Sequence, residues 1–136
     1  MYELFEHTAD LGLRVRAADL NTLFAEAAEC LFSAVLEDVG SVKPSIAVTI
    51  EIAGTDREFQ LFDWLRELLM RCDEDHMVFG KFAVKVRDDG LTGIAWGEPL
   101  DSNRHQLAHE VKAITYHGLK VVQTADGWLA EVIVDI

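Results

Sequence analysis

Apolar residues recur at helical spacing from residue 20 to residue 36 without a break. They are Leu20, Leu23, Phe24, Ala27, Ala28, Leu31, Phe32, Val35 and Leu36. The i, i+3, i+4, i+7 pattern is that of an amphipathic helix with a wide apolar face. Asp19 occupies the N-cap position, and Gly40 followed by Pro44 ends the segment. We therefore expect a helix over residues 20–36 whose apolar face must be covered by other elements.

A second helix is predicted to start within residues 55–58, because Thr-Asp-Arg-Glu has the spacing of a capping box. One apolar stripe follows it, made of Phe59, Phe62, Leu65, Leu68, Leu69 and Cys72. We expect this helix to run to about Arg71 or Asp73. The acidic run at residues 73–75 would then lie at a solvated corner, where its charge opposes the helix dipole.

Most of the remaining chain alternates between apolar and polar residues with the period of two that is typical of half-buried strands. The predicted strands cover residues 13–17, 46–52, 82–86, 91–96, 113–123 and 128–135. Tight turns at Asp88-Asp89-Gly90 and Asp126-Gly127 indicate antiparallel hairpins. A chain of 136 residues has the length of one domain. We predict a single α+β domain over residues 1–136, with largely antiparallel sheets and two main helices.

The charge of the chain is strongly acidic and disfavours direct contact with nucleic acid. Twelve Lys and Arg residues stand against 24 Asp and Glu residues, which gives a formal net charge of −12. A field of that sign repels phosphate backbones and favours a basic protein surface or a bound cation. We therefore expect no direct nucleic-acid binding.

The sequence contains no membrane or secretion signal and no common enzyme motif. It has no apolar run near the ~20 residues of a membrane span, and its first residues lack the basic start of a signal peptide. We therefore expect a soluble, cytoplasmic protein. Cys30 and Cys72 form no CxxC pair and are expected to be core thiols. Glycine-rich nucleotide loops and common hydrolase motifs are missing, so enzymatic activity has no motif to support it.

Two acidic positions are candidate ligands for a cation. Asp10 lies in His7-Thr8-Ala9-Asp10-Leu11-Gly12, where one strand ends and the next begins. An ordinary turn is the favoured interpretation of this segment, with Asp10 accepting local N–H bonds and Gly12 supplying a free φ. The segment 134–136 still has a strand pattern and ends in Asp135 and Ile136. If it runs beside Asp10, the two aspartates and the Ile136 carboxylate would require a cation, and oxygen ligands select calcium or magnesium.

Three histidines could also contribute to a site. Counting back across the Asp126-Gly127 turn places Asp135 opposite His117 or Gly118. His117 is therefore either a neighbour of that carboxylate or, as the pattern alone favours, a half-buried histidine on a sheet face. His105 and His109 have the spacing of a metal pair on a helix, but a solvated helix turn is the favoured interpretation.

Several ordered motifs resemble the archease family over nearly the whole chain. They are the segment 7–12 with the helix after it, Asp63-Trp64-Leu65-Arg66-Glu67-Leu68-Leu69, Trp96-Gly97-Glu98-Pro99, Arg104-His105, the run from Glu110 to Leu119, and the segment 132–136. Two positions depart from the family pattern: Arg66 stands where Asn is frequent and Val134 where Phe is common. Neither is a proposed ligand.

This resemblance implies an elaborated strand-helix-strand-strand (SHS2-like) fold and a divalent metal site. Asp10, Asp135 and the carboxylate of Ile136 take the ligand positions, with Ca²⁺ the expected ion and Mg²⁺ or Mn²⁺ possible alternatives. Lys112, His117 and His7 are expected to be functional residues that contact a partner.

The resemblance also implies a function. Archeases are non-catalytic activators of the RtcB-type RNA ligase, which joins 2′,3′-cyclic phosphate or 3′-phosphate ends to 5′-hydroxyl ends in tRNA splicing. They promote GTP-dependent guanylylation of the ligase and its multiple turnover. The alternative function is that of a chaperone for a tRNA methyltransferase.

Overall fold

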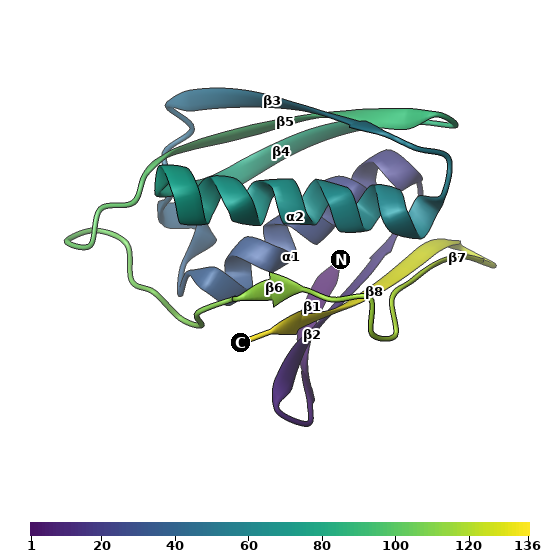
Figure 1. Cartoon of the computed structure of the whole chain (residues 1–136), viewed down its shortest axis with the longest axis horizontal. Helices are drawn as coiled ribbons and strands as arrows, with labels where there is room; N and C mark the ends of the chain where they lie inside the picture. The colour runs from purple at the N-terminus through teal and green to yellow at the C-terminus, as the bar shows by residue number, and fades with distance from the viewer.

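Two helices lie between two antiparallel sheets in a computed structural model that describes residues 1–136. Figure 1 shows α1 (Leu20–Val35) and α2 (Arg57–Asp75) side by side, with one sheet above them and the other below. Both helices contact strands of both sheets. A continuous core of 34 buried residues joins the three layers. The predicted α+β class with largely antiparallel sheets and two main helices is confirmed.

The lower sheet in Figure 1 has β8 at its centre. Its elements are β1 (Tyr2–His7), β2 (Asp10–Ala17), β6 (Ala113–Ile114), β7 (Lys120–Thr124) and β8 (Gly127–Asp135). β8 pairs with β2 along one edge and with both β6 and β7 along the other. Because β8 is covered on both edges, its final residues lie between ordered strands.

The upper sheet contains three strands in the order β3-β5-β4. They are β3 (Ile46–Ala53), β4 (Met77–Arg87) and β5 (Gly90–Pro99), and a short 3₁₀ helix, η1 (Val39–Ser41), precedes them. Gly93 lies beneath the fully buried ring of Trp64, where an added Cβ would come within 2.2 Å of that ring. The Trp64 Nε1–H donates to the carbonyl oxygen of Phe24 at 3.1 Å, which ties α2 to α1.

α1 starts at its predicted cap, Asp19, whereas the capping box predicted from Thr55 to Glu58 does not form, because α2 is capped one residue later by Asp56; α2 also ends later than predicted. Asp19 accepts from the backbone N–H of Thr22 at the start of α1, and Asp56 caps α2 by accepting from Phe59. α2 continues to Asp75, so the predicted end at Arg71 or Asp73 is wrong. The reason is His76, which adopts a left-handed conformation (φ 55°) and ends the helix as its C-cap.

The predicted strand over residues 113–123 is interrupted. Between β6 and β7 the chain leaves β8 and approaches α2, where Tyr116 stacks on Phe62 with ring centroids 4.0 Å apart. Gly118 supplies the positive φ (66°) that this turn requires. Asp135 consequently pairs with Ala113, and its predicted position opposite His117 or Gly118 is wrong.

The connection over residues 101–110 is not helical, and His105 is buried within it. The His105 Nε2 lies 2.9 Å from a carboxylate oxygen of Glu98, and its Nδ1 accepts from the backbone N–H of Asp101. The predicted solvated helix turn carrying His105 and His109 is therefore wrong. Neither α1 nor α2 is both long and apolar enough to cross a membrane.

Candidate metal centre

Asp10 and Asp135 lie at the same end of two neighbouring strands. The paired register of β2 and β8 reaches Leu11 opposite Val134, and the next position on the two strands is Asp10 and Asp135. Facing positions in antiparallel strands have Cα atoms about 4.5–5.5 Å apart. Figure 1 shows the end of β8, marked C, beside the β1–β2 hairpin. The fold thus brings two carboxylates, 125 positions apart in the sequence, to one sheet edge.

The turn before Asp10 is built differently from the predicted turn. Thr8 adopts the positive φ (51°), whereas Gly12 has no left-handed φ and is covered by the ring of Phe5. The carboxylate of Asp10 accepts no hydrogen bond from the turn or from any other group. The favoured interpretation of Asp10 as a local turn acceptor is therefore wrong, and its oxygens are free to bind a ligand.

Lys112 and Ile136 flank Asp135. The backbone N–H of Lys112 donates to the carbonyl oxygen of Asp135 at 2.7 Å, which fixes the backbone at this position. The Lys112 side chain is exposed and forms no ion pair. The Ile136 side chain packs against the core.

His7 and His117 meet beside the same hairpin. His7 pairs with Asp10 in the β1–β2 register, and its ring lies edge-on to the ring of His117 with centroids 5.6 Å apart. The backbone N–H of His117 donates to the Thr115 hydroxyl, which orients the turn that carries this exposed histidine. The Nδ1 of His7 is buried and has no hydrogen-bond partner. A polar atom in this state needs a partner that the chain itself does not supply.

The two side-chain carboxylates at this edge form only part of a donor set for a hard cation. No group of three or more His, Cys, Asp or Glu side chains in the structure could hold a metal ion. Asp10 and Asp135 supply two side-chain carboxylates, and Ile136 would supply the third. An all-oxygen set of this kind suits Ca²⁺, Mg²⁺ or Mn²⁺, whereas Zn²⁺ prefers nitrogen and sulfur.

A charged cluster on the adjacent strands holds β8 in register. Arg14 on β2 and Lys120 on β7 both bind the carboxylate of Glu131 on β8, at 2.5 and 3.2 Å. Burial alone would raise the pKa of Glu131, but the hydrogen bonds from Arg14 and Lys120 lower it below its usual value. Glu131 therefore stays ionised and joins three strands of the sheet that carries Asp135.

A second buried carboxylate anchors the connection that leads to Lys112. Glu98 accepts from the backbone N–H of Lys43 at 2.7 Å and also binds Arg104 and His105. The Lys43 bond is the main cause that lowers the pKa of Glu98 to about 2, with further contributions from Arg104 and His105. Reasoning from the sequence missed this cluster. The available signal was a glutamate at the end of an otherwise apolar strand, followed seven residues later by a histidine.

Comparison with known proteins identifies the family. Residues 2–136 match the Archease protein family (MTH1598/TM1083). The chain belongs to the archease family. An archease of Methanopyrus kandleri is 42% identical over 139 residues, covering 99% of each chain. An archease of Sulfurisphaera tokodaii is 39% identical over 137 residues, covering 99% of this chain and 98% of that one.

Solved structures agree with this assignment. The solution structure of Methanobacterium thermoautotrophicum protein 1598 matches this archease with a TM-score of 0.87 and 37% identity, covering 99% of this chain and 98% of that one. An archease from Thermotoga maritima, described as a possible chaperone, matches with a TM-score of 0.60 and 19% identity, covering 100% of this chain and 98% of that one. At that identity the second match shows the shared fold alone.

Proposed function

We propose that this archease is a non-catalytic activator of an RtcB-type RNA ligase in tRNA splicing, acting from the sheet edge that carries Asp10 and Asp135. The observation that carries the proposal is the convergence on that edge of two carboxylates with the residues for which the family resemblance implies a partner contact. Asp10 and Asp135 end neighbouring strands, Lys112 is bonded to Asp135, and His7 touches His117 beside Asp10. The partner itself comes from the family resemblance.

Asp10, Asp135 and the Ile136 carboxylate would hold a divalent cation, most simply Ca²⁺. When bound, the cation would supply positive charge to phosphate oxygens, which is how divalent ions assist phosphoryl-type transfers. The chain's own residues present the carboxylates on an ordered edge, and Lys112, whose backbone N–H donates to Asp135, carries an exposed cationic side chain. The ligase performs the guanylylation, and this protein assists it.

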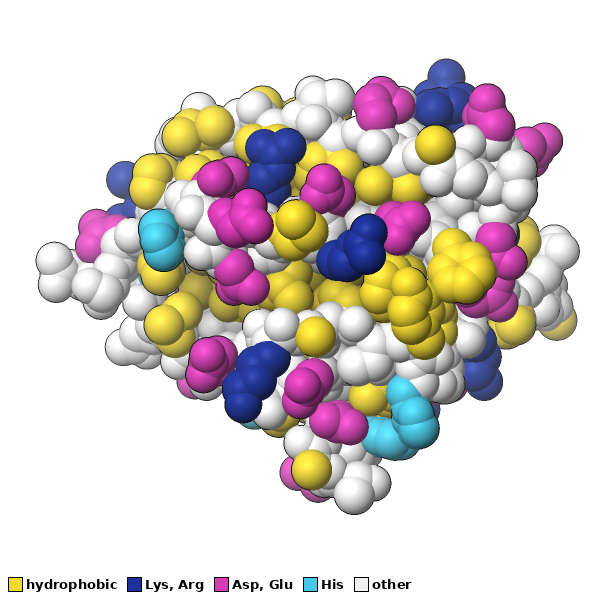
Figure 2. All heavy atoms as spheres, in the orientation of Figure 1, with side chains coloured by type: hydrophobic (Ala, Val, Ile, Leu, Met, Phe, Trp, Pro, Cys, Tyr) yellow, Lys and Arg dark blue, Asp and Glu magenta, His cyan; other side chains and the backbone are white.

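The charge of the protein supports docking on a ligase. An RNA ligase needs a positively charged channel for its substrate, and this chain has a net charge of −12. Figure 2 shows acidic side chains spread over the face that includes α2. Opposite potentials speed encounter and orient the partners, so an acidic protein is suited to a basic ligase surface.

The first experiment measures guanylylation of a cognate RtcB-type ligase with α-labelled GTP, followed by multiple-turnover joining of 3′-phosphate and 5′-hydroxyl RNA ends. Wild-type protein is expected to stimulate both steps. Asp10→Asn and Asp135→Asn, which remove charge and keep the side-chain shape, should each reduce stimulation at least tenfold. Asp126→Asn is the matched control, because this exposed carboxylate lies at the opposite end of β8 in the β7–β8 turn.

Thermal melting of the same variants separates activation from a purely structural role. An activating site predicts lost stimulation with nearly unchanged melting. A structural clip predicts that a chelator or Asp135→Asn lowers the melting temperature, because a cation bound to the folded state stabilises it. Full stimulation by both folded aspartate variants would overturn the proposed site.

A tRNA methyltransferase is the alternative partner. This chaperone role comes from the family resemblance, as the ligase role does. If wild-type protein fails to stimulate the ligase with Ca²⁺, Mg²⁺ or Mn²⁺, the ligase proposal is wrong. Protection of a cognate methyltransferase from aggregation would then support the alternative.

A further inference from the structure

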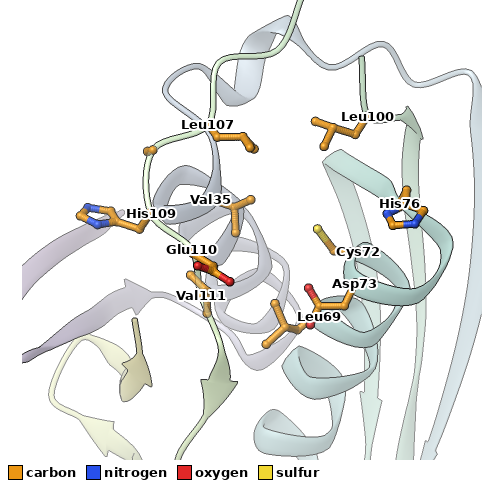
Figure 3. A pocket seen from close by; sticks show the side chains of 11 residues that line it. Val35, Leu69, Cys72, Asp73, His76, Leu100, Leu107, His109, Glu110 and Val111 are labelled. Atoms are coloured by element: carbon orange, nitrogen blue, oxygen red, sulfur yellow. The ribbon is translucent and has the colours of Figure 1, made fainter. Parts of the chain in front are cut away.

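A cavity of about 380 Å³ opens between the C-terminal ends of α1 and α2 and the connection that follows β5. Figure 3 shows apolar side chains from all three segments pointing into it. The apolar wall consists of Val35, Leu69, Leu100, Leu107 and Val111. Leu107 is 60% exposed, so this part of the wall is open to solvent. The cavity is thus an open apolar pocket, distinct from the Asp10–Asp135 edge.

The connection that forms one wall is held firmly against α1. The backbone N–H of Ala108 donates to the carbonyl oxygen of Val35, and that of His109 donates to Ala34. Leu36 and Leu107 form an isolated antiparallel bridge. These bonds use carbonyl groups at the end of α1 and keep the pocket open in the free protein, so a ligand meets a preformed wall.

Two carboxylates face each other across this apolar pocket. Figure 3 shows Asp73 on α2 and Glu110 on the connection directing their carboxylates toward the space between them. Both residues are exposed, and neither forms an ion pair. A ligand that carries positive charge can therefore bind both without breaking an existing contact.

The end of α2 adds to the negative potential at the pocket, whereas the last carbonyl groups of α1 are already paired with Ala108 and His109. α1 and α2 both end there, and neither has a basic residue in its last turn. Helix C-termini carry partial negative charge. Asp73, Glu74 and Asp75 lie in the last turn of α2, where they increase that charge.

Two histidines and a cysteine also lie at this pocket. His76 borders the pocket from the end of α2, and the ring of His109 points away from it in Figure 3. Burial raises the pKa of the Cys72 thiol to about 11, so this thiol stays neutral in the wall.

We propose that this pocket binds a lysine or arginine side chain from a basic segment of a partner protein. The aliphatic stem of such a side chain packs on Val35, Leu69 and Leu107, while its charged end lies between Asp73 and Glu110. Long basic side chains combine an apolar stem with a charged head in this way. A neutral apolar side chain would leave the carboxylates unpaired, and a short cation would leave the wall uncovered. The proposal does not depend on the identity of the ligase.

The test uses the full-length ¹⁵N-labelled protein and four heptapeptides of Gly and Ser that differ only at the central residue. That residue is lysine, arginine, norleucine or diaminopropionic acid. Norleucine keeps the stem without the charge, and diaminopropionic acid keeps the charge without the stem. The lysine and arginine peptides should shift the amide signals of residues 107–111 and 69–76 and bind at least fivefold more tightly than either analogue.

Three variants examine the pocket with the tighter of the two peptides. The double variant Asp73→Asn/Glu110→Gln should weaken binding about fivefold or more, and Leu107→Asn should weaken it while all charges remain. Asp126→Asn removes one acidic charge far along the sheet and should leave binding unchanged. Equal losses in Asp126→Asn and the double variant would show that only net charge matters and would overturn the proposal.

The same titration can also show that the pocket binds a different occupant, and two such results would overturn the proposal. If the norleucine peptide binds as tightly as the lysine peptide, the pocket accepts any apolar side chain and the proposal is wrong. If signals of residues 107–111 shift on raising the protein concentration alone, and sedimentation shows a dimer that Leu107→Asn dissociates, the occupant is a second copy of this chain. That result would also overturn the proposal.

Discussion

Glu98 shows how one buried carboxylate can hold a long connection in place. Its oxygens bind the backbone N–H of Lys43, the guanidinium of Arg104 and the ring of His105. Because Asp101 N–H donates to Nδ1 of His105, the proton of the neutral ring lies on Nε2 and is donated to Glu98. The start of the connection is therefore fixed by hydrogen bonds, even though it forms no regular structure.

Replacing this carboxylate should destabilise the protein in a pH-dependent way. The pKa of Glu98 falls from 4.5 to about 2 in the folded protein. A lowered pKa means that its stabilisation is present above pH 4.5 and is lost as the pH falls through about 2. Glu98→Gln should lower the melting temperature by several degrees at pH 7, and the difference from wild type should shrink between pH 4.5 and pH 2.

Thermal melting by circular dichroism across this pH range measures that difference. Glu6→Gln is the control, because Glu6 is an exposed carboxylate without an ion-pair or hydrogen-bond partner. A melting difference for Glu98→Gln that stays constant from pH 7 to pH 2 would contradict the assigned role of its charge.

At the scale of elements, the cap of α1 should contribute measurably to stability. Asp19 accepts from the backbone N–H of Thr22 at 2.8 Å. Asp19→Ala leaves that donor unpaired and should reduce the free energy of unfolding by about 1 kcal/mol. Asp19→Asn keeps a side-chain oxygen and should cost much less. Urea unfolding of the three proteins measures both values, and equal losses in the two variants would show that the cap bond is not the cause.

The elements that could be predicted from the sequence are those whose signals are local. The apolar stripe and Asp19 locate α1, and tight turns locate the hairpins. The break after β6 could not be predicted in this way, because it depends on Tyr116 stacking on Phe62, far away in the sequence. The burial of His105 likewise depends on Glu98, which belongs to another element.

The candidate site was even less accessible to local reasoning. Asp10 and Asp135 become neighbours only because β8 pairs with β2. The spacing of apolar residues predicts that a segment is a strand, but it does not predict which strands are neighbours in the sheet. The family resemblance named these residues, while the pattern around Asp10 favoured a simple turn. The pocket at the helix ends escaped prediction for the same reason, since it needs the tertiary placement of three separate segments.

At the scale of the whole molecule, the net charge of −12 should make stability depend on salt. Excess charge of one sign destabilises a folded protein through self-repulsion. Many of the ion pairs involve exposed side chains and contribute little. Raising KCl from 10 to 300 mM shortens the range of the repulsion and should raise the melting temperature.

Choline chloride at equal ionic strength distinguishes screening from specific potassium binding. If screening is the cause, both salts should raise the melting temperature by the same amount. A melting temperature that falls with either salt would mean that ion pairs such as Arg14–Glu131 outweigh the repulsion.

The central position of β8 has a consequence for synthesis. Ala17 pairs with Trp128, more than a hundred positions later in the chain. On a ribosome, the β1–β2 hairpin therefore emerges long before the strand that covers its inner edge. Until residues 127–135 leave the exit tunnel, that edge presents unpaired backbone groups and the apolar residues of β2 to other nascent chains. The hairpin therefore needs shielding during translation until β8 is available to pair with it.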